Sequence, residues 1–255
     1  MKPRLFSIIY DDDDILAVNK ISGLAVSADR WNYSKRRLDT LLAEVTGRRL
    51  FTVHRIDSGT SGIVVFAKNA AAHRRLSIAF ESRAVHKTYT AGVCGVPQWS
   101  ETVCEAPLVV NGDKLHRTII DKYRGKKSLT RFRLLYSAGR VSVIEAEPES
   151  GRTHQIRVHL ASLGLPIICD PLYGSENPLF LSSIKKGWRG DPFDERPLIG
   201  RLALHAAKLR LPARDGTDLL LEAPYPKDMS ALLRQASLHQ TYASRPACTN
   251  HTPVA

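Results

Sequence analysis

The residue types best suited to chemistry gather in the segment His-Arg-Ile-Asp-Ser-Gly-Thr-Ser at positions 54–61, which runs directly into the apolar stretch Gly-Ile-Val-Val-Phe-Ala-Lys. Its one carboxylate, Asp57, stands next to a histidine and an arginine and could act as a nucleophile or as a base. An aspartate before Ser-Gly-Thr-Ser is also a common turn former, whose side chain binds local backbone N–H groups. The segment alone leaves both interpretations open.

Two other segments carry reactive side chains. Lys-Thr-Tyr, ending at Tyr89, opens a predicted strand, where a tyrosine is usually structural. Residues 150–159, SGRTHQIRVH, bring Arg152, His154 and Arg157 close together. A helix with two arginines is most often a solvated surface, and the apolar spacing places Arg157 away from the core-facing side.

Taken together, the three segments resemble the pseudouridine synthases of the RluA type, which modify ribosomal and transfer RNA. The central motif of that family is His-Arg-(Leu/Ile)-Asp-x-x-Thr-Ser-Gly followed by apolar residues and Ala-Lys, and this chain has HRIDSGTSGIVVFAK. The second motif, Lys-x-Tyr before a short strand and a glycine, is matched by KTYTAGVCG, and the third by GRTHQIRVHLASLGLPIICDPLYG. The resemblance covers about residues 5–226.

The resemblance implies a reaction in which a uracil is detached from its ribose, turned, and rejoined through carbon 5, with no cofactor. It gives Asp57 the role of the nucleophile and Arg157 that of its positive partner. It places Tyr89 against the target base, where the ring can stack and the hydroxyl can help to remove the proton from carbon 5. It also implies that Arg55 fills the space that a flipped uridine leaves in its stack.

The charge of the chain points to the same class of partner. Lys plus Arg number 37 against 25 for Asp plus Glu, giving a net charge of +12, as expected of a protein that binds a polyanion. The charge is densest in residues 114–133, with eight Lys or Arg against one aspartate, and we expect Lys126 and Lys127 there to contact RNA phosphates. Arg152 and His154 are also expected to contact RNA. A basic surface without a specific partner, or a hairpin edge that is merely solvated, are the alternatives.

Composition excludes several other classes. A chain of 255 residues with 43% hydrophobic residues can bury a core without disulfides or metal. Its four cysteines form no Cys-x-x-Cys pair, no apolar run reaches the length of a signal peptide or membrane helix, and no glycine-rich phosphate loop is present. We therefore expect a cytoplasmic monomer that needs neither a metal nor a cofactor.

The elements expected to position these residues are mostly strands. Strands are predicted over 5–10, 15–20, 62–68, 87–95, 130–137, 140–148, 201–211 and 218–224, and helices over 37–47, 69–82, 153–163 and 226–235. Thr153 is expected to cap the third helix. Because the helices do not alternate with the strands, the pattern favours an α+β fold with a mixed, mostly antiparallel sheet. The resemblance implies the pseudouridine synthase fold of that class.

We expect one catalytic domain over residues 1–236, with no separate N-terminal RNA-binding domain. Residues 237–255 lose apolar periodicity and are expected to form a disordered tail. An RNA-binding or ribosome-assembly protein without catalysis would be free to lose Asp57, Tyr89 or Arg157, and all three are present. A hydrolase is less favoured, because no second carboxylate, serine elbow or metal-spaced cluster accompanies Asp57. The enzyme interpretation is therefore preferred.

Overall fold

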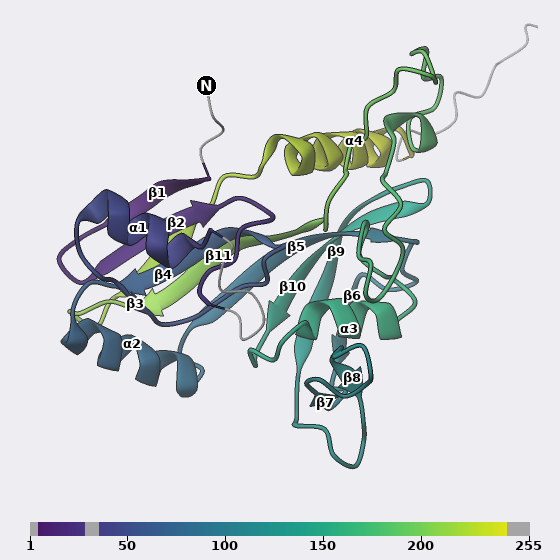
Figure 1. Cartoon of the computed structure of the whole chain (residues 1–255). Coiled ribbons are helices and arrows are strands. Elements are labelled where there is room, and N and C mark those ends of the chain that lie inside the picture. The colour runs from purple at the N-terminus through teal and green to yellow at the C-terminus, as the bar shows by residue number, and fades with distance from the viewer. Residues whose placement is uncertain (1–4, 29–35, 244–255) are drawn as a thin grey trace, which may run out of the picture.

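The structure, a computed structural model, describes residues 5–28 and 36–243, and a ten-stranded sheet runs through it (Figure 1). Its strands are β1 (Phe6–Asp11), β2 (Ile15–Lys20), β3 (Phe51–Thr52), β4 (Ser61–Ala67), β5 (His86–Cys94), β6 (Glu101–Cys104), β9 (Thr130–Ala138), β10 (Val141–Pro148), β11 (Leu204–Pro212) and β12 (Asp218–Glu222). They follow the order β1-β2-β4-β11-β5-β10-β9-β6, with β3 beside β4 and β12 beside β11. All pairs are antiparallel except β4 with β11. The predicted mixed sheet is confirmed.

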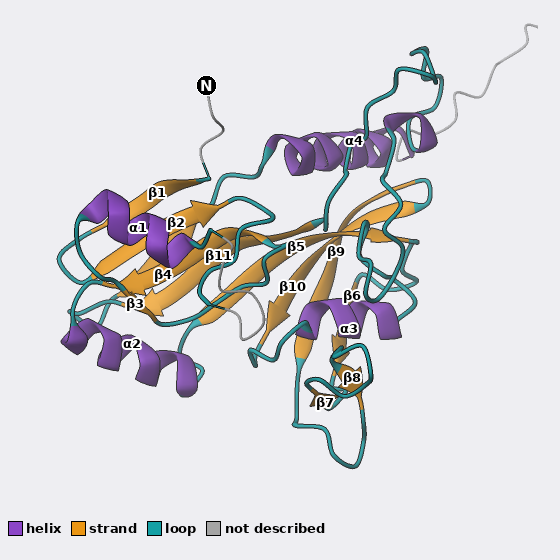
Figure 2. Ribbon diagram, in the orientation of Figure 1, coloured by secondary structure: helices purple, strands orange, loops and turns teal. Residues whose placement is uncertain are grey.

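In the described part of the chain four helices cover this sheet, and Figure 2 shows how they are distributed over it. They are α1 (Leu38–Thr46), α2 (Ala70–Glu81), α3 (Gln155–Ser162) and α4 (Lys227–Ala243), with a short 3-10 helix η1 at Leu181–Ser183. Successive residues of a strand point to opposite faces, so Val64 of β4 packs with Leu42 of α1 while Val65 packs with Leu76 of α2. Helices α1 and α2 therefore sandwich one half of the sheet. In the other half, α4 lies above the sheet and α3 below it (Figure 1).

Gly62 fixes how the Asp57 loop enters the sheet. It has a φ of +114°, and it pairs with Ala206 where β4 and β11 run parallel. A Cβ at this position would lie 2.2 Å from the carbonyl oxygen of Ala206. The glycine that ends Thr-Ser-Gly is therefore required by the close approach of two backbones. This contact holds the preceding loop against the centre of the sheet.

The C-terminal helix is longer than predicted. The expectation of a disordered tail over residues 237–255 is wrong for residues 237–243, because α4 continues to Ala243. The added turns contain neither glycine nor proline, and each residue added to an existing helix gains a hydrogen bond without a new nucleation step. Residues 244–255 lie outside the described part of the chain. In the described ranges no helix is long and apolar enough to cross a membrane.

Candidate active site

A pocket of about 540 Å³ opens between the loop that precedes β4, strand β5 and the start of α3. Six of the eight predicted site residues line it: Asp57, Tyr89, Arg157, Arg55, Arg152 and His154. These residues come from positions up to 102 apart in the chain, by 157 minus 55. Lys126 and Lys127, the other two, do not line the pocket.

Asp57 presents its carboxylate to this pocket. Its side chain is 26% exposed, and Oδ2 lies 3.3 Å from Nη1 of Arg157. The turn is closed by the backbone, because the N–H of Thr60 donates to the carbonyl of Asp57 at 3.1 Å. Within the described residues no backbone N–H donates to the carboxylate itself. Asp57 thus forms the turn with its backbone and leaves its side chain available for the pocket.

Asp170 binds the edge of the Arg157 guanidinium that Asp57 does not contact. Its Nε and Nη2 donate to the two carboxylate oxygens of Asp170 at 2.8 and 2.7 Å, and its guanidinium carbon lies 5.1 Å from the ring centre of Tyr173. Burial lowers the pKa of Arg157, but hydrogen bonds and charge from Asp170, followed by the charge of Asp57, outweigh burial and raise it. The alternative that Arg157 lies on a solvated helix face is wrong, because only 6% of the residue is exposed.

The start of α3 differs from the prediction that Thr153 caps it. His154 is the capping residue, with a φ of +56° and no hydrogen bond from its side chain to the helix. Instead the buried Gln155 reaches back, and its Oε1 accepts from the backbone N–H of Arg152 at 3.1 Å and from Ser150 Oγ at 2.7 Å. This unusual turn points the ring of His154 at Asp57.

His154 lies between Asp57 and Tyr173. Its Nε2 is 3.8 Å from Asp57 Oδ2, and its Nδ1 is 3.0 Å from the hydroxyl of Tyr173. That hydroxyl already accepts the N–H of Thr118 at 2.9 Å, so its own proton is placed to be donated to Nδ1. Burial lowers the pKa of His154, against the opposing effect of Asp57. A neutral ring then carries its proton on Nε2, facing the carboxylate.

Tyr89 stands on β5, where its neighbours across the sheet are Ala146 and Ala206. Two small neighbours leave its ring free to form one wall of the pocket. Burial, and then the charge of Asp57, raise the pKa of Tyr89 far above its usual value. The hydroxyl therefore keeps its proton at neutral pH.

Comparisons with known proteins identify the family of the chain. Residues 14–162 match the family of RNA pseudouridylate synthases. The chain belongs to this family. It is 33% identical over 239 residues to the ribosomal large subunit pseudouridine synthase D of Zymomonas mobilis, covering 89% of this chain and 71% of that protein.

Two further relatives cover nearly the whole of both chains. An uncharacterized RNA pseudouridine synthase of the same bacterium is 34% identical over 230 residues, 88% of this chain and 96% of its own. The solved structure of the human RNA pseudouridylate synthase domain containing 4 superposes with a TM-score of 0.70 at 27% identity, over 91% of this chain and 93% of that one. The predicted RluA-type family and fold are thus confirmed, and the chain is an isomerase that converts uridine to pseudouridine.

The pseudouridine synthase also carries cations at the mouth of its pocket. Arg55 is exposed there, and Arg152 is half-buried with its Nε enclosed and without a hydrogen-bond partner in the described residues. Lys87 lies on the same face of β5 as Tyr89, and its amine donates to the carbonyl of Ser150 at 3.3 Å. Burial, and then the charge of Arg83, lower the pKa of Lys87. A buried unpaired donor beside these charges is suited to an anionic ligand.

Lys20 does not line the pocket but supports the Asp57 loop, a role that the sequence pattern did not indicate. It is 1% exposed, and its amine donates to the carbonyls of Ile21, Leu24 and Ser58 at 3.0, 2.7 and 3.1 Å. Burial lowers the pKa of Lys20 to about 7, although the nearby charge of Asp57 acts in the opposite direction. Three carbonyl acceptors need the three N–H groups of an ammonium, so the protonated form fits the site. Through Ser58, Lys20 ties the Asp57 loop to β2.

The basic segment 114–133 is partly neutralised. Four of its eight cations are paired with carboxylates: Arg117 with Asp113, Arg124 with Asp121, Arg131 with Glu149, and Arg133 with Glu145. Lys126 and Lys127 are exposed and form no ion pair with described residues. The segment includes β8 (Ile119–Ile120), which pairs with β7 (Leu108–Val109) in a separate small sheet beside the site.

This small sheet is attached to the active site of the synthase. The backbone N–H of Thr118 donates to the hydroxyl of Tyr173 at 2.9 Å, and Arg117 donates to the carbonyl of Leu172 at 3.0 Å. Tyr173 in turn contacts His154 and Arg157. The exposed lysines therefore project from a segment anchored at the pocket wall. Nowhere in the described residues is a group of three or more His, Cys, Asp or Glu side chains arranged to hold a metal.

Proposed function

We propose that this synthase isomerises uridines of ribosomal RNA, with Asp57 as the nucleophile. The observation that carries the proposal is the different exposure of the two carboxylates that Arg157 contacts. Asp57 is 26% exposed in the pocket, whereas Asp170 is fully buried and cannot touch a substrate. Asp170 is then a positioning residue, and Asp57 is left as the reacting group. The name of the Zymomonas relative supports the large ribosomal subunit as the substrate.

The pocket suggests how the reaction proceeds. The target uridine must leave its stack to reach Asp57, and the exposed Arg55 occupies the vacated space. Asp57 attacks the sugar carbon that carries uracil, so a bond from this carbon to the carboxylate forms as its bond to N1 breaks, and the base turns while the pocket retains it. Carbon 5 then bonds to the same sugar carbon and displaces the carboxylate of Asp57, carbon 5 loses its proton, and N1 gains one. The atoms of substrate and product balance, so the step asks for no oxidant, reductant or cofactor.

Arg157 and Tyr89 act at different points of this sequence. Arg157 keeps Asp57 ionised, because a carboxylate in a closed pocket would otherwise take up a proton. Tyr89 stacks on the base, and its protonated hydroxyl donates a hydrogen bond to a water molecule; when carbon 5 loses its proton, the hydroxyl accepts it and passes its own proton to that water. Arg152, with its enclosed and unpaired Nε, binds a phosphate beside the target nucleotide. His154 donates from Nε2 toward the carboxylate of Asp57 or toward the RNA.

The proposal is tested by mapping pseudouridines in total RNA from cells with and without the gene, and from cells that carry the Asp57→Asn variant instead. One or more positions in ribosomal RNA should revert to uridine in both altered strains. Sites lost only from transfer RNA would replace the proposed substrate with transfer RNA. An unchanged map, with the protein bound to ribosomal RNA, would favour the alternative of an RNA-binding protein without catalysis.

A further inference from the structure

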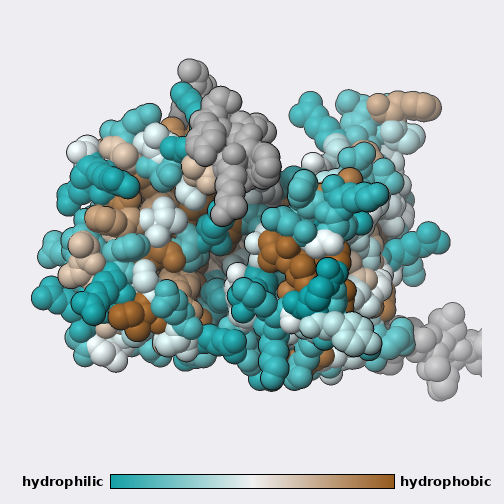
Figure 3. All heavy atoms as spheres, turned by 60° about the horizontal axis from the view of Figure 1, so that its bottom comes forward, coloured by the Kyte–Doolittle hydropathy of each residue, from teal (hydrophilic) through white to brown (hydrophobic). Residues whose placement is uncertain are grey.

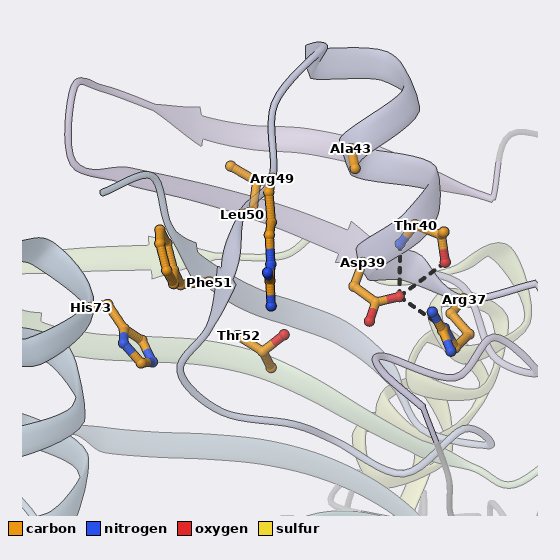
Figure 4. A pocket seen from close by; sticks show the side chains of 9 residues that line it. All are labelled: Arg37, Asp39, Thr40, Ala43, Arg49, Leu50, Phe51, Thr52 and His73. Carbon is orange, nitrogen blue, oxygen red and sulfur yellow. Dashed lines mark hydrogen bonds and ion pairs between the residues drawn. The ribbon is translucent and has the colours of Figure 1, made fainter. Parts of the chain in front are cut away.

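A second pocket, of about 500 Å³, lies where α1, β3 and the first turns of α2 meet (Figure 4). The wall of this pocket includes Arg37, Asp39, Arg49, Phe51, Thr52 and His73. Figure 4 shows Arg49 extending into the space between the rings of Phe51 and His73 on one side and Asp39 on the other. Nothing in the proposed reaction uses this pocket.

The pocket offers hydrogen-bond donors that the described residues do not use. Its carboxylate, Asp39, is occupied, because it accepts from Arg37 at 3.1 Å and from the backbone N–H of Thr40 at 2.7 Å. Arg49 makes no hydrogen bond or ion pair with any described residue, and the same holds for the side chains of Thr52 and His73. An unpaired guanidinium next to an occupied carboxylate leaves a net positive pocket. The pocket is therefore complementary to an anion.

Two stacked ring pairs connect this pocket to the active site. Phe51 stacks on His73 with ring centres 5.3 Å apart, and His54 stacks on Phe80 with centres 4.7 Å apart. The first pair lines the second pocket, and the second pair lines the catalytic pocket. His73 and Phe80 are seven residues apart on one face of α2, a distance of about 10 Å along the helix. The two pockets thus lie side by side along one face of α2 and along the chain segment that runs from Phe51 in β3 to His54.

We propose that the second pocket binds the RNA strand that leaves the catalytic pocket, with a backbone phosphate on Arg49. The 10 Å along α2 correspond to about three stacked nucleotides, since each adds about 3.4 Å. The volume exceeds what a lone phosphate needs, and Phe51 offers an aromatic surface for a base, which is the combination that single strands bind. The inference rests on the proposed function, because the strand is the one whose uridine reaches Asp57.

The test is the Arg49→Ala variant, with Arg48→Ala as its matched control. Both arginines are exposed and adjacent in the chain, but only Arg49 lines the pocket. Binding of a fluorescent oligouridylate of about ten nucleotides is measured by anisotropy over a range of salt concentrations. Arg49→Ala should weaken binding about tenfold and reduce the slope of log affinity against log salt by about 0.7. Arg48→Ala should change binding less than about twofold and leave the slope as it is.

Two outcomes overturn the inference. Wild-type binding by Arg49→Ala would show that the pocket does not hold the strand, and equal weakening by both variants would show diffuse surface charge instead. Circular dichroism confirms that each variant is folded. Failure of the proposed function gives a different result. It appears in a turnover assay, where the wild-type protein would form no pseudouridine, and it does not depend on how the two arginine variants bind.

Discussion

Asp170 accepts two parallel hydrogen bonds from Arg157, of 2.8 and 2.7 Å, and leaves one nitrogen of the guanidinium for Asp57. This ion pair lies in the interior, where Asp170 is fully buried and also accepts a hydrogen bond from the backbone N–H of Leu172 at 3.0 Å. A planar guanidinium bound on one edge cannot rotate, so its remaining nitrogen points in a fixed direction. The orientation of the proposed nucleophile therefore depends on a residue that never meets the substrate.

The variant Asp170→Asn tests how strongly the buried pair of Asp170 and Arg157 stabilises this arrangement. Removing one partner of a buried ion pair leaves a charge uncompensated, and we expect a loss of about 3–5 kcal/mol in the free energy of unfolding. Urea unfolding measures it. Glu145→Gln is the control, since it breaks the exposed pair with Arg133 and should cost at most about 1 kcal/mol. Equal losses in the two variants would show that the buried pair has no special weight.

Tyr89→Phe separates stacking from the action of the hydroxyl. The ring remains, so RNA affinity should change less than about twofold, whereas the single-turnover rate should fall about 10²- to 10⁴-fold. Tyr123→Phe is the control, because Tyr123 is 98% exposed and lies outside the pocket. A single-turnover rate equal to that of the wild type would show that the hydroxyl is idle.

The segments that local pattern decides were predictable. The apolar run of β4, the helical spacing of α2 and the end of α1 at Gly47, in the left-handed conformation, all agree with the sequence. The parallel pairing of Gly62 with Ala206 joins residues 144 positions apart, by 206 minus 62, and no local pattern encodes it. The start of α3 was mispredicted because Gln155 bonds the backbone N–H of Arg152 and, 26 positions away in the chain, the carbonyl of Leu129, and the second of these contacts is not visible in the local sequence.

Site residues whose roles the motifs imply were predictable, and residues whose roles depend on burial were not. Asp57, Tyr89 and Arg157 come from three motifs and share one pocket. Asp170 lies within the third motif but was given no role, and Lys20 was given none either, because their roles depend on partners distant in the sequence. The charge of segment 114–133 was overestimated for the same reason, since Glu145 and Glu149 neutralise part of it from outside. A cytoplasmic location, the monomeric state and a single domain over residues 1–236 stay predictions.

Lys126 and Lys127, two of the four lysines of that segment without an ion pair in the described residues, give a third prediction. If Lys126 and Lys127 contact RNA phosphates, Lys126→Ala with Lys127→Ala should weaken binding to specific and unrelated RNA alike. The slope of log affinity against log salt should flatten by about one to two, at about 0.7 to 0.9 for each contact. Lys208→Ala is the control, because Lys208 is paired with Glu222 at 2.8 Å. An unaltered slope in the folded double variant would identify the segment as a solvated edge.

A buried histidine predicts loss of stability in acid. Burial lowers the pKa of His205 from 6.5 to about 4, and the neutral ring contacts Ser61 at 3.0 Å and the carbonyl of Ala223 at 3.3 Å. The unfolded chain takes up a proton near pH 6.5 and the folded chain only near pH 4, so stability is lost as the pH falls between these values. At pH 5 this amounts to about 2 kcal/mol.

Urea unfolding at pH 7 and pH 5 measures this effect. His205→Gln should be less stable than the wild type at pH 7, yet lose about 2 kcal/mol less between the two pH values. His86→Gln, at an exposed position, should behave as the wild type does. The same pH dependence in His205→Gln and in the wild type would assign the acid sensitivity to other groups.

The role of Asp57 is tested most directly by single-turnover release of tritium from RNA labelled at carbon 5 of uridine, because that carbon loses its hydrogen only if the new bond forms. Asp57→Asn keeps the volume of the side chain and removes the nucleophile. The variant should bind the RNA with nearly wild-type affinity, since Asp57 makes no phosphate contact, and release no tritium above background. Tritium release by the folded variant at a measurable fraction of the wild-type rate would contradict the assignment of Asp57 as the nucleophile.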